Sequence, residues 1–431
     1  MVTVSEVLIW NTFVGAIAWN ENTNYAVFEF DKNFLKKNLD LAPVMMPLNE
    51  ALAGNGIFSF PRLNKDTYKG LPGMLADSLP DKYGNNLINI WLAQKGRPAE
   101  SFTPVERLCY IGKRGMGALE FEPATDSFSS KGKNLDVNDL AKLAEEIISE
   151  RKKLKATLKG KEEKELMEII RVGSSAGGAR AKAIIAYNEE TEEVRSGQID
   201  GLSGYEYWII KFDGVTDKAL SGPQGYCRRE YAYYLMAKNC GIEMSKCLLY
   251  EENNRAHFMT KRFDRKGTKK IHMQTLCAIA HYDYNAAGYY SYEQAFEVMR
   301  RLKLPHNEME QLYKRMVFNV IARNQDDHTK NISFLMDEGG VWKLAPAYDL
   351  TYALDPENKW LMAHQMRING KIKDIVREDL IDVAKVANIK KHKLIIEEVI
   401  NTASEWNKFA TIAGVEKEQI IQIQKHLKLN I

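Results

Sequence analysis

The fold of this chain is decided by residues 311–335, QLYKRMVFNVIARNQDDHTKNISFL. The first part, 311–321, predicts a helix that is apolar on almost every face, and such a helix is normally buried. The polar residues 322–331 then predict a loop, which the buried helix would hold rigidly. The apolar residues 332–336 predict a strand that leaves this loop.

A β-hairpin is predicted directly after the loop. Residues 337–340, Asp-Glu-Gly-Gly, have the composition of a tight turn between strands 332–336 and 341–345. Because the hairpin returns the chain to its starting point, we expect Asp349 to meet Asn331. Carboxylate and amide oxygen atoms are ligands that Mg²⁺ accepts. These two residues therefore predict a metal site.

Asp326 lies five residues before Asn331. Protein kinases place a catalytic base and a metal-binding asparagine with the same spacing, D-x-x-x-x-N. Asp326 would accept the proton of a substrate hydroxyl group, and Lys330 could neutralise charge on a transferred phosphoryl group. The spacing alone is common, however, and Asp326 with Asp327 and His328 could instead form a hydrolytic metal cluster.

Residues suited to binding the phosphates of a nucleotide also occur earlier in the sequence. Residues 173–182, GSSAGGARAK, combine small residues, whose backbone N–H groups can approach phosphates, with the basic Lys182. The same composition fits a flexible loop. Lys211 ends an apolar strand, the place from which a kinase lysine reaches phosphates. Glu230 in the next predicted helix is its expected ion-pair partner, and an unrelated surface pair is the alternative.

The chain is too long, at 431 residues, for one hydrophobic core. We expect a small α+β domain over 1–124, a charged helical linker over 125–165, a β-rich lobe over 166–265 and a helical lobe over 266–431. Within the linker, a helix after a capping Asp136 is predicted, and we interpret the charged run as solvated. Many folds share this order of elements, so it is weak evidence alone.

Composition excludes several classes of protein. The 60 basic side chains almost balance 57 acidic ones, so the chain as a whole has no electrostatic footprint for nucleic acid. The number of cysteines, five, is odd and no pair has CxxC spacing, which indicates reduced thiols. No apolar stretch approaches the roughly 20 residues of a membrane helix, and no secretory leader is recognisable. We expect a cytoplasmic protein without membrane contact.

Together these segments resemble the HipA-like serine/threonine kinases, the toxins of bacterial type II toxin–antitoxin modules. The resemblance implies an α+β chain with a bilobal protein-kinase-like fold, a β-rich N-lobe and a helical C-lobe, preceded by a small α+β N-terminal domain. It rests on segments along most of the chain: 70–81 (GLPGMLADSLPD), 111–119 (IGKRGMGAL), 175–182 (SAGGARAK), 261–265 (KRFDR), 326–331 (DDHTKN), 348–349 (YD) and 366–371 (MRINGK).

The resemblance implies a role for each candidate site residue. Asp326 would be the catalytic aspartate assisted by Lys330, and Asn331 with Asp349 would hold Mg²⁺. The residues expected to contact ATP are Gly177, Gly178, Ala179, Lys182, Lys211 and the backbone of Lys261 to Phe263. Ser175, or the adjacent Ser174, aligns with a serine that family members autophosphorylate, which silences the enzyme. The family loop often has Gln-Glu before its lysine, whereas this chain has Arg180 and Ala181.

The same resemblance implies the partners. They are a protein substrate, such as a component of the translation apparatus, and a small HipB-like helix-turn-helix antitoxin through which alone the chain would meet DNA. Two other functions stay open on the sequence: a catalytically silent, antitoxin-binding co-repressor and a small-molecule phosphotransferase.

Overall fold

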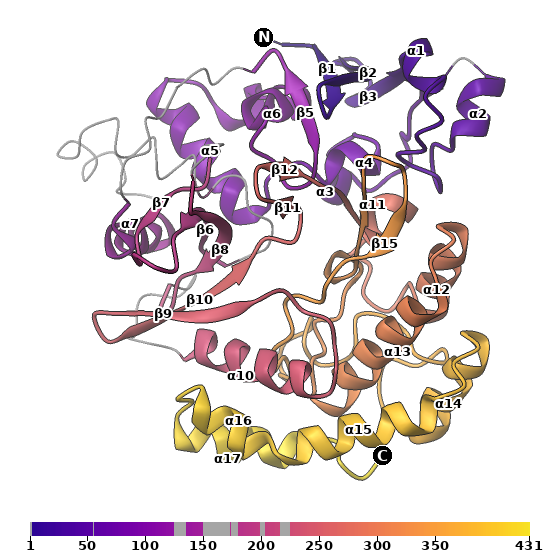
Figure 1. Ribbon diagram of the computed structural model, residues 1–431. Helices are drawn as coiled ribbons and strands as arrows, with labels where there is room; N and C mark the ends of the chain where they lie inside the picture. The colour runs from indigo at the N-terminus through magenta and orange to yellow at the C-terminus, as the bar shows by residue number, and fades with distance from the viewer. Residues whose placement is uncertain are drawn as a thin grey trace.

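The computed structural model describes residues 2–54, 56–124, 135–149, 173, 180–198, 203–215 and 225–431. The chain is a mixed α+β protein, as predicted, with two five-stranded sheets, a three-stranded sheet and a two-stranded ribbon in these ranges (Figure 1). None of the helices in the described residues is long and apolar enough to cross a membrane.

The N-terminal sheet is antiparallel, with strand order β4-β3-β2-β1-β5. Its strands, with the helices that follow them, fit the α+β domain predicted for 1–124, and alternate residues of β1 are buried. The strands are β1 (Val4–Ile9), β2 (Thr12–Asn20), β3 (Tyr25–Phe30), β4 (Ile57–Phe58) and β5 (Leu119–Glu122). The helices of this part are α1 (Lys32–Leu35), α2 (Leu48–Ala53), α3 (Lys65–Tyr68), α4 (Gly73–Ala76), α5 (Lys82–Gln94), the 3-10 turn η1 (Ala99–Ser101) and α6 (Pro104–Ile111).

The second sheet carries two of the candidate lysines and has the order β7-β6-β8-β10-β9. Its strands are β6 (Lys182–Tyr187), β7 (Val194–Ser196), β8 (Glu206–Lys211), β9 (Cys247–Glu252) and β10 (Arg255–Lys261). Antiparallel pairing puts Lys182 directly opposite Lys211, which brings the two lysines to the same end of the sheet. Helix α10 (Tyr226–Asn239) packs on this sheet, and Gly241, with a φ of +74°, ends it as predicted.

Helix α7 (Val137–Ser149) corrects part of the linker interpretation. The Asp136 side chain accepts a hydrogen bond from the Asp139 amide, 3.1 Å, so the predicted cap is confirmed. Its apolar face is not solvated, because Val137, Leu140, Ala141 and Ala144 are buried in one cluster with residues of α5, β6 and β8. The charged run that follows lies outside the described residues. The boundaries predicted at 124, 165 and 265 stay predictions.

The rest of the chain is mostly helical, as predicted, and the predicted hairpin gains a third strand, β13 (His272–Thr275), that the sequence did not reveal. Strand β13 pairs with β14 (Ser333–Met336), which pairs with β15 (Trp342–Leu344), and the ribbon β11 (Arg265–Lys266) and β12 (Lys269–Lys270) precedes them. The helices are α11 (Leu276–Ala280), α12 (Tyr292–Arg301), α13 (His306–Ile321), the 3-10 turn η3 (Thr329–Asn331), α14 (Arg377–Val386), α15 (His392–Ser404), α16 (Trp406–Ile412) and α17 (Lys417–His426).

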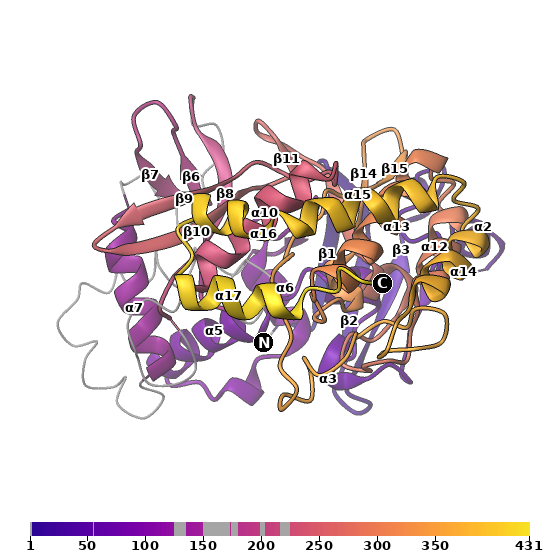
Figure 2. The ribbon, with the colours of Figure 1, turned by 90° about the horizontal axis from the view of Figure 1, so that it is seen from below.

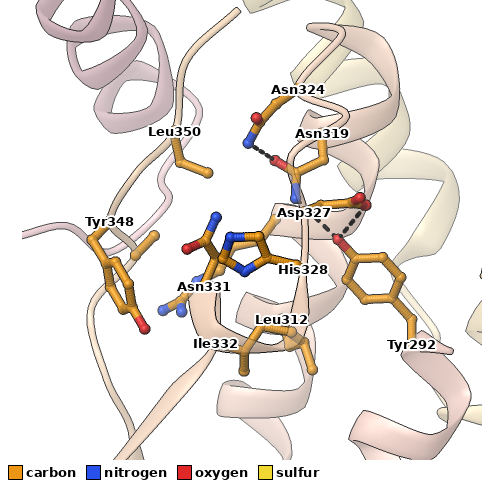
Figure 3. A pocket seen from close by; sticks show the side chains of 12 residues that line it. Tyr292, Leu312, Asn319, Asn324, Asp327, His328, Asn331, Ile332, Tyr348 and Leu350 are labelled. Atoms are coloured by element: carbon orange, nitrogen blue, oxygen red, sulfur yellow. Dashed lines mark hydrogen bonds between the residues drawn. The ribbon is translucent and has the colours of Figure 1, made fainter. Parts of the chain in front are cut away.

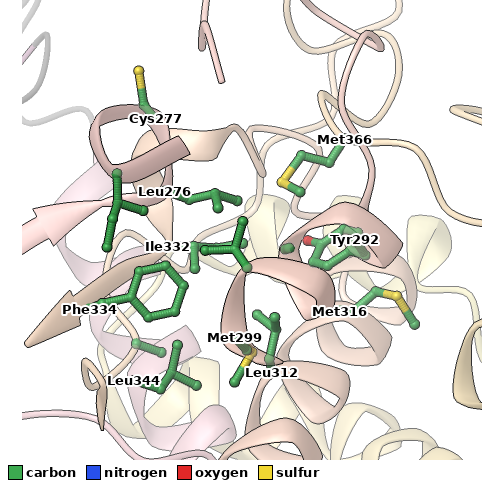
Figure 4. Packing of buried hydrophobic residues seen from close by; sticks show 14 of the residues in the cluster. Leu276, Cys277, Tyr292, Met299, Leu312, Met316, Ile332, Phe334, Leu344 and Met366 are labelled. Atoms are coloured by element: carbon green, nitrogen blue, oxygen red, sulfur yellow. The ribbon is translucent and has the colours of Figure 1, made fainter. Parts of the chain in front are cut away.

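The long helix α13 confirms the buried helix predicted at 311–321. Met316, Val317 and Phe318 have no exposed surface, and Figure 4 shows Leu312 of this helix gathered with Ile332 and Phe334. On its other side α13 packs on α15, while α16 packs on α10, so the C-terminal helices run along both (Figure 2). The loop after α13 is therefore held by a helix that is itself enclosed.

The predicted hairpin is also confirmed. Phe334 pairs with Leu344, and the Asp337 carboxylate closes the turn by accepting hydrogen bonds from the amides of Gly339, 2.9 Å, and Val341, 3.0 Å. This hairpin is what returns the chain from residue 331 to residue 348.

A buried aspartate joins two of the segments that carry the family resemblance. Asp264 accepts a two-pronged hydrogen bond from Arg262, at 2.9 and 2.7 Å, one from Arg265 at 2.7 Å, and one from the Gly117 amide at 2.7 Å. Both arginines also bind the Gly115 carbonyl. Segment 111–119 of the N-terminal unit is thereby fixed to the chain between the second and third sheets.

We expect Asp264→Asn to lower the free energy of unfolding by about 3–5 kcal/mol, because it leaves two buried guanidinium groups without their counter-charge. Urea or thermal denaturation measures this loss. Asp66→Asn, at an exposed position, is the matched control and should stay within about 0.5 kcal/mol of the parent. A loss no larger than that of the control would contradict the joining role.

The same variant should change the response to acid. Burial alone would raise the pKa of Asp264, but Arg262 and Arg265 together hold it well below its usual range. Its contribution to stability is therefore present above the pKa of an unfolded aspartate, about 3.9, and is lost as the pH falls below it. We expect the parent to lose more stability than Asp264→Asn over that acid range in urea titrations.

Candidate functional site

The loop after α13 carries Asp326. The carboxylate is about half exposed, and its Oδ1 lies 3.8 Å from Nε2 of His328. Partial burial raises the pKa of Asp326, and the negative charges of Asp349 and Asp327 add to this effect. The carboxylate of Asp349 thus acts on Asp326 although the two are far apart in sequence.

Asp327, in contrast, is buried beside Tyr292 and fixes the loop (Figure 3). Its carboxylate accepts hydrogen bonds from the Tyr292 hydroxyl, 3.0 Å, and the Gln365 amide, 2.7 Å, and lies 2.9 Å from Nδ1 of His364. Asn319 of α13 binds the same Tyr292 hydroxyl. The catalytic-type loop is therefore clamped to α12, α13 and segment 364–365.

This burial speaks against the hydrolytic cluster that the sequence left open. Asp326 is about half exposed, whereas Asp327 is buried and used by Tyr292, His364 and the Gln365 amide. Among the residues that the structure describes, no group of three or more His, Cys, Asp or Glu side chains is placed to hold a metal ion.

Lys211 forms the predicted ion pair with Glu230, and it also binds a second carboxylate, that of Asp349. Its Nζ lies 2.5 Å from Oε1 of Glu230 and also binds Oδ1 of Asp349. Burial alone would lower the pKa of Lys211, but the two carboxylates, Asp349 first, raise it above its usual range. In turn Lys211 and Lys182 hold the pKa of the partly exposed Asp349 well below its usual range. Lys211 and Asp349 are consequently both charged at neutral pH.

The hairpin brings Asp349 back to the loop that carries Asn331. The Tyr348 hydroxyl donates to the Lys330 carbonyl, 2.6 Å, and also contacts Ser333, so the residue before Asp349 lies against the residue before Asn331. Nδ2 of Asn331 donates to the Asp326 carbonyl, 2.7 Å. Because this hydrogen bond uses the nitrogen of the side-chain amide, the amide oxygen of Asn331 stays available to bind a metal ion.

The side chains of Asn331 and Asp349 fit Mg²⁺. The candidate ligands are oxygen atoms, which this hard cation prefers. The effect of Asp349 on the pKa of Asp326 shows that the site gathers negative charge that a cation would offset.

Lys182 is at the start of β6 and is buried. Its Nζ lies 3.7 Å from Oδ2 of Asp81, at the N-terminus of α5. Arg180, just before it, approaches Glu230 at 4.0 Å. The other residues predicted for this loop, Ser174, Ser175, Gly177, Gly178 and Ala179, lie outside the described residues.

The segment expected to face the adenine, 261–263, uses two of its backbone N–H groups within the protein, and its role toward a nucleotide stays a prediction. The Lys261 amide binds the Lys246 carbonyl, 2.9 Å, and the Arg262 amide binds the Tyr207 carbonyl, 2.8 Å. These two N–H groups are therefore used inside the protein. The Lys261 side chain pairs with Glu206. Phe263 packs on Tyr348, the residue before Asp349, with ring centroids 5.6 Å apart.

A cavity lies between the second sheet and the returning hairpin. Its lining combines the charged side chains of Lys211, Glu230 and Asp349 with apolar ones, which suits a ligand with a charged and an apolar part. Its lining residues are Lys211, Glu230, Met244, Cys247, Phe258, Thr260, Tyr348, Asp349 and Leu350.

Sequence reasoning missed two carboxylates near this site. Asp77 and Asp81 were noted only as part of motif 70–81, and Asp81 alone predicted nothing beyond a helix start. The signal that could have found them was the presence of two acidic residues in one motif of a protein with three candidate lysines. Spatial proximity to the lysines could not be read from the spacing.

Comparison with known proteins identifies the family. Residues 174–407 match the model of the HipA-like C-terminal domain, and residues 5–122 match that of the HipA N-terminal domain. A curated relative from Sinorhizobium fredii, named "Putative kinase Y4mE", is 28% identical over 152 residues, which cover 33% of this chain and 33% of that protein. The aligned region is thus about a third of the relative's length.

A solved structure supports the fold. The chain superimposes on a chain of the Shewanella oneidensis complex of HipA, HipB and operator DNA with a TM-score of 0.68. The match covers 98% of this chain and 94% of the other at 16% identity. With both of its domain models matched along the sequence, the chain belongs to the HipA-like family.

Proposed function

We propose that this protein is an ATP- and Mg²⁺-dependent serine/threonine protein kinase of the HipA-like toxin type. The observation that carries the proposal is the buried ammonium of Lys211 between Glu230 and Asp349, close to Asp326. A lysine paired with a helix glutamate beside a metal-binding aspartate is the arrangement by which kinases hold nucleotide phosphates. The family membership and the relative's name point the same way.

In the proposed reaction Lys211 and Lys182 bind the phosphates of ATP. Asn331 and Asp349 would hold Mg²⁺, which would neutralise charge on the phosphates. Asp326 orients the serine or threonine hydroxyl of the protein substrate and accepts its proton. The hydroxyl oxygen bonds to the γ-phosphorus, and the bond from that phosphorus to the oxygen retained by ADP breaks.

Lys330 would stabilise charge in the transition state. Its Nζ lies 4.8 Å from the centre of the Tyr284 ring. Burial alone would lower its pKa, but Asp77 first among its neighbours raises it, so the group is charged at neutral pH. A fixed positive charge of this kind acts without reorganisation during the reaction.

Replacing the proposed base tests the catalytic assignment. We expect Asp326→Asn to lower phosphoryl transfer from labelled ATP by about 10²-fold or more, because the hydroxyl proton loses its acceptor. Asp66→Asn serves again as the exposed control. Equal incorporation of label by Asp326→Asn and the control would remove Asp326 from this role. Label in small metabolites of a lysate, with none in protein, would replace the protein substrate by a small molecule.

We also propose that the kinase phosphorylates Ser175 or Ser174. The support is that both flanks of their loop lie at the site. A side chain added at Gly173 would meet Leu87 and Tyr83 of α5, while Arg180 approaches Glu230. A phosphate introduced between these points would put a dianion inside a site built for other phosphates, which is a reasonable off-switch.

Intact mass spectrometry after incubation with Mg·ATP tests this modification. We expect the parent to gain the mass of a phosphoryl group and Asp326→Asn to gain none. Ser174→Ala and Ser175→Ala should show which serine carries it, since only one of them should abolish the gain. A gain that persists in the double variant would locate the modification elsewhere.

The partner proposal rests on the solved relative. That structure contains HipA with HipB and operator DNA. We propose that this chain likewise binds a small helix-turn-helix antitoxin and meets DNA through it, in line with its balanced charge. Co-purification with the product of a neighbouring helix-turn-helix gene tests the pairing.

A further inference from the structure

Asp81 and Lys182 come from different parts of the chain, yet their side chains are buried together. Their exposed fractions are 8% for Asp81 and 4% for Lys182, and Oδ2 lies 3.7 Å from Nζ. Two opposite charges buried at this distance interact more strongly than a surface pair.

The carboxylate of Asp81 is held rigidly by its own helix. Its Oδ1 caps α5 by accepting a hydrogen bond from the Gly84 amide, 2.7 Å, where the positive end of the helix also favours a negative charge. Oδ2 is buried and has no hydrogen-bond partner. A charge-assisted hydrogen bond would measure about 2.7–2.9 Å, which is shorter than the distance from Oδ2 to the Lys182 ammonium. Asp81 therefore attracts this ammonium electrostatically but does not hydrogen-bond to it.

Lys182 depends on this charge. Burial lowers the pKa of Lys182, and Asp81 is the largest charge that opposes the effect, ahead of Asp349. Lys211 acts in the same direction as burial, and Glu230 weakly opposes it. Without Asp81, the lysine would lose the largest charge that opposes the effect of burial.

The same loop supplies a second carboxylate. Asp77 accepts hydrogen bonds from the amide and the hydroxyl group of Thr275, at 2.7 and 2.9 Å. It is the largest charge acting on Lys330. Segment 77–81 of the N-terminal unit thus acts on two lysines: Lys182 from the second sheet and Lys330 from the loop after α13.

We propose that Asp81 is a positioning residue of the phosphate-binding site, which holds Lys182 in place for the phosphates of the nucleotide. This inference rests on the proposed function, and it makes the N-terminal unit part of the active site. The alternative is that Asp81 serves only as the cap of α5.

Asparagine separates the two roles, because it caps helices about as well as aspartate but carries no charge. Asp31→Asn is the matched control: Asp31 caps α1 by accepting hydrogen bonds from the amides of Asn33 and Phe34, both 2.9 Å. Asp31→Asn should keep the melting temperature of the full-length parent, and circular dichroism checks that Asp81→Asn is folded at the temperature of the binding assay. Asp81→Ser, a second neutral cap, repeats the test if Asp81→Asn folds poorly.

A double-mutant cycle measures the coupling. Calorimetry gives the Kd of a nonhydrolysable Mg·ATP analogue for the parent, Asp81→Asn, Lys182→Met and the double variant. We expect Asp81→Asn to weaken binding about tenfold in the parent and less than about twofold in the Lys182→Met background, because coupled neighbours are not additive. Asp31→Asn should bind like the parent.

The failures are distinguishable. A parent that binds no analogue, or a Lys182→Met variant that binds like the parent, would overturn the proposed nucleotide site itself. With that site intact, three results would overturn the positioning role: equal weakening in both backgrounds, no weakening, or tighter binding by Asp81→Asn.

Discussion

The ammonium of Lys211 joins the two halves of this protein around one charge. It is bound by Glu230, from a helix that packs on the second sheet, and by Asp349, which the hairpin delivers from the helical part. A buried lysine is costly unless it is paired, and here neither half alone supplies both partners. The charge therefore favours the arrangement in which sheet and hairpin face each other across the cavity.

The remaining charges of the site extend the same pattern. Asp77, Lys330, Asp81, Lys182, Asp349, Lys211 and Glu230 alternate in sign, and the pKa of each of the three lysines depends on the carboxylates next to it. Such an arrangement keeps several positive groups close together before any phosphate arrives. A site of this kind is preorganised, because the protein has already offset the repulsion between its lysines.

Sequence patterns predicted the elements that local chemistry determines. The buried helix α13, the hairpin closed by Asp337, the strand that ends in Lys211 and its partner Glu230 could be read from periodicity, turn composition and spacing. The burial of α7 could not be, because its apolar face is short and a charged run follows it. Strand β13 was missed because it is only four residues long and its partner comes 58 residues later.

The site itself was predictable only in part. The spacing of Asp326, Asn331 and Asp349 suggested that they meet. That Asp327 is buried while Asp326 is half exposed depends on packing against Tyr292 and His364, which the spacing does not show. The N–H groups of Lys261 and Arg262 are used by carbonyls from other strands, which no local pattern reveals. Asp81 is a helix cap by its sequence, and its second role depends on a lysine far along the chain.

The joint at Asp264 has a consequence for synthesis of the protein. Gly117 and Asp264 are 147 residues apart, and at roughly 5–20 residues per second a ribosome needs about 7–30 s to make that stretch. During this interval the N-terminal unit has left the ribosome while β12, β13 and α11, against which it will pack, do not yet exist. The nascent chain thus exposes the apolar surface of its first unit for seconds, which is a natural time for a chaperone to bind.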